Sequence, residues 1–103
     1  MTTRRKKSEA MKFMEEISGG PLTFGRMLNS IRMCDEYSQV EFAKLLGISK
    51  SHLCDVEKGR KSVSPGRAVR WAKTLGYGER QFVRLSLQQM LDRDNIDLEV
   101  KVA

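Results

Sequence analysis

One segment, residues 38–59 ("SQVEFAKLLGISKSHLCDVEKG"), constrains the fold most, because it places two short helices on either side of one glycine. Ser38 and Glu41, three residues apart, form a capping box, which predicts where the first helix begins. Gly47 suits the left-handed backbone that ends a helix, Ser49 is the expected N-cap of the second helix, and Gly59 ends it. The apolar residues expected to hold the two helices together are Phe42, Ala43, Leu46, Ile48, Leu53 and Val56. The segment therefore predicts two helices that cross around a tight turn.

Helical patterns also flank this segment on both sides. Thr23 is the expected N-cap of a helix within residues 22–34. Ser64 precedes Pro65, which suits the first position of a helix that Gly76 ends. A last helix is expected over about residues 79–92. Since a chain of 103 residues suits one small domain, we predict an all-α fold of five helices over residues 21–94.

The C-terminal tail, residues 95–103, changes from helical spacing to strict alternation of apolar and charged residues, which predicts a β-strand. No second strand pattern is recognised in the chain, so we expect this strand to pair with its copy across a dimer axis. The alternative is a frayed tail. The last helix has apolar residues on more than one face, which suggests a second contact surface. The residues expected at the dimer contact are Leu87, Met90, Leu91, Ile96, Leu98, Val100 and Val102.

Residues 1–20 are expected to form a flexible segment that binds a partner. They begin with the basic run "RRKK" and end in the flexible break "SGGP". Between these lie four apolar residues at helical spacing, Ala10, Phe13, Met14 and Ile17. Because a helix of about ten residues is marginal alone in water, we expect this one to form on its partner. The alternative is a terminal helix that folds onto its own domain.

The charge of the chain is concentrated in its middle. The net charge is +6, and residues 44–73 hold eight Lys or Arg against only two acidic residues. Residues 79–103 hold four basic and five acidic residues, so their charge nearly balances. A localised basic face is typical of a surface that binds phosphate groups, although a merely solvated surface would also be charged.

Several classes of function are disfavoured by the composition. The only cysteines, Cys34 and Cys54, do not form a disulfide framework, and the chain has one histidine, His52. His52 and Cys54 are two apart, a spacing that points them to different sides of a helix and makes a poor metal chelate. No nucleophile-base-acid set, phosphate-binding loop, signal peptide or apolar run of about 20 residues is visible. We therefore expect a cytoplasmic protein with no enzymatic activity, metal, cofactor or membrane contact.

The pattern "SQ-x-x-FA-x-x-x-GI-x-x-x-x-L-x-x-x-E-x-G", with Arg32 seven residues before Gln39, resembles the Xre/Cro family of helix-turn-helix proteins, which includes the lambdoid phage repressors. The resemblance covers about residues 22–75 and implies a lambda-repressor-like DNA-binding domain. It implies that Gln39 contacts a DNA phosphate and that the helix after Gly47 is the recognition helix. Arg32 and Glu57 would form an internal ion pair that ties the first helix to the third.

The residue chemistry of the implied recognition helix suits DNA. An α-helix fits the major groove, and its N-terminal side chains reach base edges. Lys50 can donate to guanine, Ser51 can donate or accept, and Asp55 can accept from cytosine, with His52 at the margin. Three cations that follow would contact backbone phosphates, namely Lys58, Arg60 and Lys61. The alternative is a surface helix in a protein–protein interaction module.

A narrower resemblance extends over most of residues 22–103, where the sequence is similar to HigA-type antitoxins of bacterial toxin–antitoxin operons. It implies a bacterial, nucleoid-associated homodimer that represses its own operon at a palindromic operator in double-stranded DNA. It also implies that the protein neutralises a toxin, typically a RelE-like ribosome-dependent ribonuclease, to which residues 1–20 would bind. A stand-alone repressor without a toxin remains the alternative.

Overall fold

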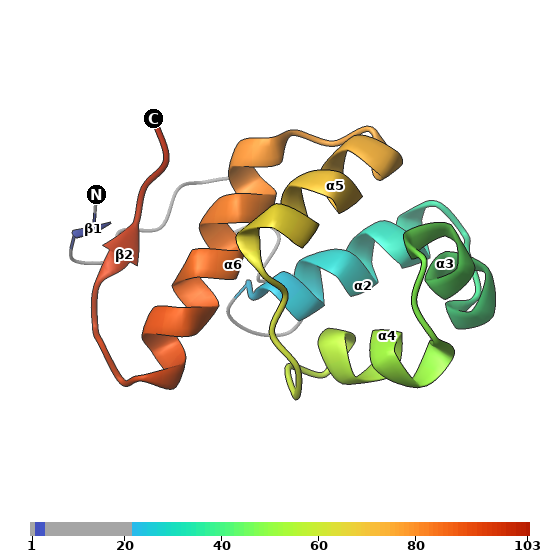
Figure 1. Ribbon diagram of the computed structural model, residues 1–103, viewed down its shortest axis with the longest axis horizontal. Coiled ribbons are helices and arrows are strands. Elements are labelled where there is room, and N and C mark those ends of the chain that lie inside the picture. Colours follow the sequence, from blue (N-terminus) through green and yellow to red (C-terminus); the bar gives the residue numbers. More distant parts are fainter. Residues whose placement is uncertain (1, 4–21) are drawn as a thin grey trace.

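The computed structural model describes residues 2–3 and 22–103, and these residues form five α-helices and two very short strands (Figure 1). The helices are α2 (Phe24–Cys34), α3 (Gln39–Leu46), α4 (Lys50–Glu57), α5 (Pro65–Leu75) and α6 (Glu79–Arg93). The strands are β1 (Thr2–Thr3) and β2 (Glu99–Val100). The predicted five-helix, mainly α fold is therefore confirmed. The helix expected around Ala10, Phe13, Met14 and Ile17 lies outside the described residues.

The first four of these helices begin where the sequence predicts, because a hydroxyl side chain caps each one. Thr23, Ser38, Ser49 and Ser64 each accept a hydrogen bond from the backbone N–H three residues later. The capping box at the start of α3 is complete, since Glu41 also accepts from the backbone N–H of Ser38. Each cap lies within three residues of the donor that it satisfies, so the boundaries of these helices are set by local sequence.

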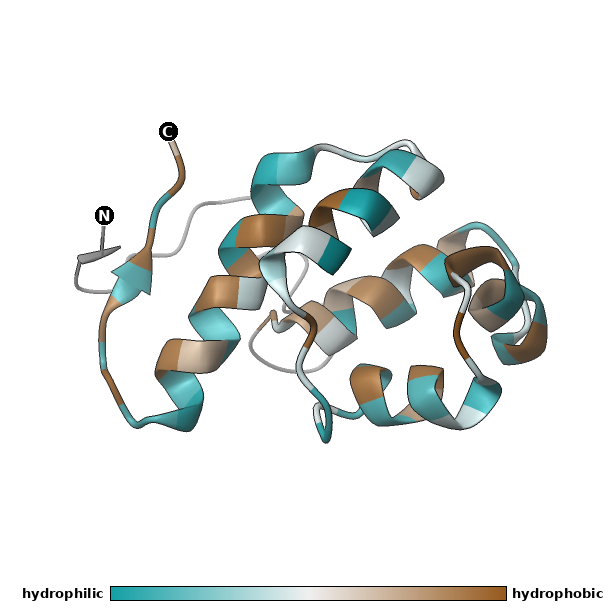
Figure 2. Cartoon of the chain, in the orientation of Figure 1, coloured by the Kyte–Doolittle hydropathy of each residue, from teal (hydrophilic) through white to brown (hydrophobic). Residues whose placement is uncertain are grey.

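The core lies between the helices and contains three fully buried phenylalanines. Phe24 of α2 meets Phe82 of α6 edge to face, with 5.8 Å between the ring centroids. Apolar segments recur along the helices in Figure 2, as expected for helices that bury one face. Trp71 of α5 is also buried, and its indole Nε1–H donates to the carbonyl oxygen of Leu46 at 3.2 Å. This bond satisfies one of the last carbonyls of α3 and joins α5 to it.

Helix α2 crosses the end of α4 at Gly25, where the two backbones come very close. A Cβ atom at Gly25 would lie 2.3 Å from the carbonyl oxygen of Val56 and 2.6 Å from that of Glu57. Backbone atoms cannot move aside as a flexible side chain can, so this crossing requires glycine. The sequence alone did not single out this residue.

The tail differs from the prediction in two respects. The expectation that the chain offers no partner strand is wrong, because β1 pairs antiparallel with β2, with Thr2 opposite Val100 and Thr3 opposite Glu99. The strict alternation also fails, because Glu99 and Val100 are both buried. A pair of threonines carries no recognisable alternation, which is why the sequence did not reveal β1.

The tail is fastened to α6 by one buried side chain, Gln88, which is 5% exposed. Its amide Nε2 donates to the carbonyl oxygen of Leu98 at 2.8 Å, and its Oε1 accepts from the backbone N–H of Val100 at 2.8 Å. The Gln88 amide therefore acts as a neighbouring strand would. Among the residues expected at a dimer contact, Leu87 and Leu91 are half-buried and Val100 is buried, whereas Met90, Ile96, Leu98 and Val102 are exposed.

Replacing Gly25 with alanine tests the close crossing of α2 and α4. We expect Gly25→Ala to lower the free energy of unfolding by about 1–3 kcal/mol, because the new Cβ forces the helices apart. Gly66→Ala is the matched control, since the nearest atom to its Cβ would be the Arg70 side chain at 3.8 Å. At this helical position alanine should stabilise the fold by about 0.5–1 kcal/mol. Equal effects of the two substitutions in urea unfolding would refute the crossing.

Candidate nucleic-acid interface

The outer side of α3 and α4 carries an open hollow of about 420 Å³. Its lining comes from the N-terminal end of α3, the outer face of α4 and the loop after α4: Gln39, Lys50, Ser51, Cys54, Asp55 and Arg60. Five of these six are residues that the sequence assigned to DNA. The structure therefore brings together, on one side of the molecule, groups that lie up to 21 positions apart in the chain.

Helix α4 presents this face because its opposite face is anchored in the core. Leu53 and Val56 are 0% and 1% exposed, which fixes the rotation of the helix about its axis. Lys50 and Ser51, in the first turn, are exposed, and Asp55 lies about one turn farther along the same face. The N-terminal half of α4 is thus accessible to a ligand while its apolar side holds the helix in place.

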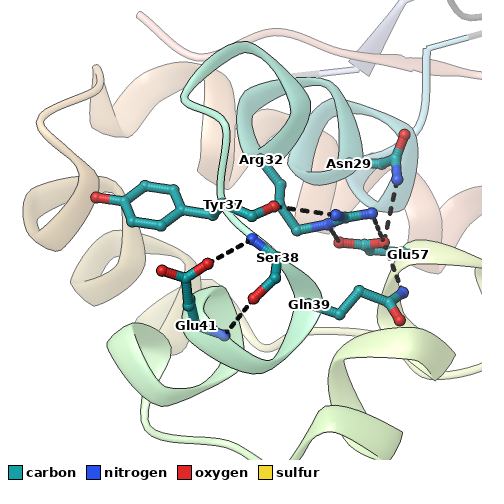
Figure 3. Close-up of polar contacts among 7 residues, drawn as sticks. All are labelled: Asn29, Arg32, Tyr37, Ser38, Gln39, Glu41 and Glu57. Atoms are coloured by element: carbon teal, nitrogen blue, oxygen red, sulfur yellow. Dashed lines mark hydrogen bonds and ion pairs between the residues drawn. The ribbon is translucent and has the colours of Figure 1, made fainter.

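Behind the hollow, the carboxylate of Glu57 accepts four hydrogen bonds from two other helices (Figure 3). Arg32 of α2 donates from Nε to Oε2 at 2.8 Å and from Nη2 to Oε1 at 3.2 Å. Asn29 of α2 donates to Oε1 at 3.1 Å. The side chains of Arg32 and Glu57 are only 13% and 5% exposed, so solvent screens this ion pair little.

Gln39 connects this buried network to the hollow. Its amide Nε2 donates to Glu57 Oε1 at 3.3 Å, and the same side chain lines the hollow. A glutamine amide carries two N–H donors, so one can hold Glu57 while the other is free for a ligand. Glu57 therefore orients the side chain that the sequence assigned to a phosphate contact.

Asp55 is engaged by two cations of the loop that follows α4. Its carboxylate lies 3.3 Å from Arg60 Nη1 and 3.9 Å from Lys61 Nζ. Its backbone carbonyl oxygen accepts from the N–H groups of Arg60 and Lys61, at 2.8 and 3.3 Å. The carboxylate that we expected to face base edges is thus shared with these two cations, which offset its charge beside the hollow.

The geometry agrees with a comparison to known families. Residues 36–82 match the Helix-turn-helix family HTH_3. The matched region contains both α3 and α4 and extends through α5. A crystal structure of an HTH_3 family transcriptional regulator from Vibrio cholerae is similar to 79% of this chain, with 21% sequence identity and a TM-score of 0.52. This chain spans 40% of the length of that one. No curated protein matches the sequence.

Three predicted contact residues take different places around the helix-turn-helix. Lys61 is exposed and lies beside Asp55, as described above. Lys58 does not line the hollow, and borders openings on the side of α2 together with Arg26. His52 does not line it either and is half-buried. Cys54, to which we assigned no role from the sequence, does line the hollow, because it lies on the same face of α4 as Lys50 and Ser51.

The part of the chain that the structure describes contains no group of three or more histidine, cysteine or acidic residues that could hold a metal ion. Within that part, no helix is both long enough and apolar enough to cross a membrane. Both cysteines, Cys34 and Cys54, are free thiols.

Removing the Glu57 carboxylate tests how far the helix-turn-helix depends on it. We expect Glu57→Ala to lower the free energy of unfolding by about 3–5 kcal/mol, because the guanidinium of Arg32 stays nearly buried without its partner. The matched control is Glu79→Ala, which breaks an exposed pair with Lys73 at 3.6 Å and should cost less than about 1 kcal/mol. Chemical denaturation gives both values. A cost for Glu57→Ala as small as that of the control would contradict the role assigned to the network.

Titration of His52 makes the free energy of unfolding depend on pH. Burial lowers the pKa of His52 below its usual value, the nearby charges of Lys61 and Arg67 lower it further, and Asp55 opposes them. His52 in the unfolded state therefore binds a proton more readily than His52 in the folded state. The neutral imidazole contributes its full share to the free energy of unfolding above pH about 6.5, and this share is lost as the pH falls through the folded pKa of His52.

We expect the free energy of unfolding to fall less between pH 7.5 and pH 5 in the His52→Gln variant than in the wild type, because glutamine does not titrate. Urea unfolding at a series of pH values measures the difference. Parallel pH profiles for the two proteins would show that His52 is not responsible.

Proposed function

We propose that this protein binds double-stranded DNA with α4 in the major groove and regulates transcription. The observation that carries the proposal is the hollow on the outer side of the helix-turn-helix, which gathers Gln39, Lys50, Ser51 and Arg60 from three successive segments. An α-helix has the width of the major groove, and a helix anchored by its opposite face can lie in it without distorting the fold.

The groups in and around the hollow divide between bases and phosphates. We assign Lys50 and Ser51, which are exposed in the first turn of α4, to base edges such as guanine O6 and N7. We assign Gln39, Arg60 and Lys61 to backbone phosphates beside the groove. Phosphate contacts provide affinity without sequence information, so specificity is assigned to the start of α4.

The charge distribution supports the same proposal. The basic surplus of the sequence lies within residues 44–73, which include α4, its loop and most of α5. Each phosphate contact releases condensed counterions, so affinity for duplex DNA should fall steeply as salt concentration rises.

We further propose that the protein acts as a homodimer at a palindromic operator. Two copies related by a two-fold axis would place two α4 helices in successive turns of the groove. The exposed apolar side chains of Met90, Ile96, Leu98 and Val102, near the end of α6 and along the tail, support a contact between copies in this region.

The finer proposal is a HigA-type antitoxin that represses its own operon and neutralises a RelE-like ribonuclease. It is supported by the sequence resemblance over residues 22–103. The proposed toxin-binding residues Ala10, Phe13, Met14 and Ile17 lie outside the described residues. Co-purification of the natural operon, followed by mass spectrometry of the bound chains, tests it: a small ribonuclease would support the proposal, and this chain alone would refute it.

Removing both donors at the start of α4 tests the assignment of sequence specificity. Selection from a random duplex library should enrich one sequence with the wild-type protein and none with Lys50→Ala combined with Ser51→Ala. The residual affinity of the variant for random duplex should depend on salt, because its other cations remain.

The matched control for this experiment is Lys73→Ala combined with Thr74→Ala, which removes the same groups from an exposed site near the end of α5. It should enrich the wild-type sequence. Enrichment of that sequence by the α4 variant would contradict the recognition helix, and a wild-type protein that enriches no sequence would refute sequence-specific binding.

A further inference from the structure

The loop after α4 carries the cations Arg60 and Lys61, yet its backbone is held at several points. Gly59 has a φ of 78°, a left-handed conformation that turns the chain directly after α4. The carbonyl oxygen of Asp55 fixes the next two residues through their N–H groups. Farther along, Val63 is 2% exposed, and its carbonyl oxygen accepts from the buried hydroxyl of Ser86 at 2.6 Å. The loop is therefore a defined part of the fold.

Arg93, the last residue of α6, donates hydrogen bonds to two residues of this loop. Its Nη2 donates to the carbonyl oxygen of Gly59 at 3.2 Å, and its Nη1 donates to the hydroxyl of Ser62 at 3.5 Å. These two acceptors lie on either side of Arg60 and Lys61. The rigid fork of a guanidinium can span two acceptors in this way, and the single ammonium of a lysine cannot present the same geometry.

The ion pairs that orient the two cations add little to stability. The side chains of Arg60 and Lys61 are 62% and 56% exposed, and ion pairs at such exposed sites are strongly screened by solvent. Their consequence is geometric, because Asp55 draws both side chains toward the hollow beside α4. Arg93 and Asp55 thus hold the same loop from α6 and α4.

We propose that Arg93 is a positioning residue for DNA binding: it fixes residues 59–62 so that Arg60 and Lys61 face the phosphates beside α4. This inference rests on the proposed function and deepens it by assigning a role to α6, outside the helix-turn-helix. Holding the loop in place before binding removes the cost of ordering it when the phosphate arrives. Arg93 acts through the loop rather than by its own contact with DNA.

A double-mutant cycle separates positioning from direct contact. The probe is a random-sequence 30-base-pair duplex, with dissociation constants measured at several salt concentrations. We expect Arg93→Ala to weaken binding about five- to tenfold in the wild type, but less than about twofold in a background that carries Arg60→Ala and Lys61→Ala. Because the loop cations are already absent there, positioning them gains nothing. Arg93→Lys should behave like Arg93→Ala, since it keeps the charge and loses the fork.

The control is Arg80→Ala, which removes the same charge from the first turn of α6 and should change affinity by the same small factor in both backgrounds. Thermal unfolding checks that each variant is folded. If Arg93→Ala is unfolded, the affinities of Arg93→Lys in the two backgrounds are compared instead. Equal losses on Arg93 replacement in both backgrounds would indicate a direct phosphate contact and overturn the proposal. Unchanged affinity in the wild-type background would also overturn it. A wild-type protein that binds no duplex would refute the proposed function itself.

Discussion

The arrangement of the helix-turn-helix depends on one carboxylate. Glu57 accepts hydrogen bonds from Asn29 and Arg32 of α2 and from Gln39 of α3, although it belongs to α4. Its side chain is 5% exposed, so its charge is tolerated only because four donors compensate the lost hydration. A single residue thereby sets the relative positions of three helices, and the same network orients an amide at the edge of the hollow.

The close crossing at Gly25 and the Glu57 network act at the same end of α4. The carbonyl groups that exclude a Cβ at Gly25 belong to Val56 and Glu57, so backbone contact and side-chain bonding fix the C-terminal end together. The N-terminal end begins at Lys50, where the Ser49 side chain caps the helix and the exposed Lys50 and Ser51 face outward. A helix fixed at one end and exposed at the other is suited to present its first turn to a groove.

Much of this fold could be predicted from the sequence, because the residues that begin and end its helices are local signals. The hydroxyl caps, the Ser38–Glu41 box and the glycine after α3 are signals within a few residues of the feature they set. Contacts between distant segments left no such local signal, and the Arg32–Glu57 pair was expected only from the family resemblance. The pairing of Thr2–Thr3 with β2 joins the two ends of the described chain, and Gln88 fastens the tail with an amide that looks like any polar helix residue.

The candidate site was predictable to the same extent. Lys50, Ser51, Asp55 and Gln39 follow from a pattern within 22 residues, and the structure gathers them around one hollow. The hydrogen bond from Gln39 to Glu57 and the contact of Arg93 with the loop form only when α3, α4 and α6 pack, at separations of 18 and 34 residues. Such roles depend on tertiary geometry, which no local pattern encodes.

The most direct test of DNA binding on the outer side of the helix-turn-helix is a titration of ¹⁵N-labelled protein with duplex DNA, in which the NMR signals of the backbone amides are recorded at each step. We expect salt-dependent shifts of the amide signals at Gln39, in the first turn of α4 and at Arg60 and Lys61, with little change around Met90 and Ile96. Shifts confined to the surface around Met90 and Ile96, or no shifts at low salt, would contradict the assignment of DNA binding to the outer side of the helix-turn-helix.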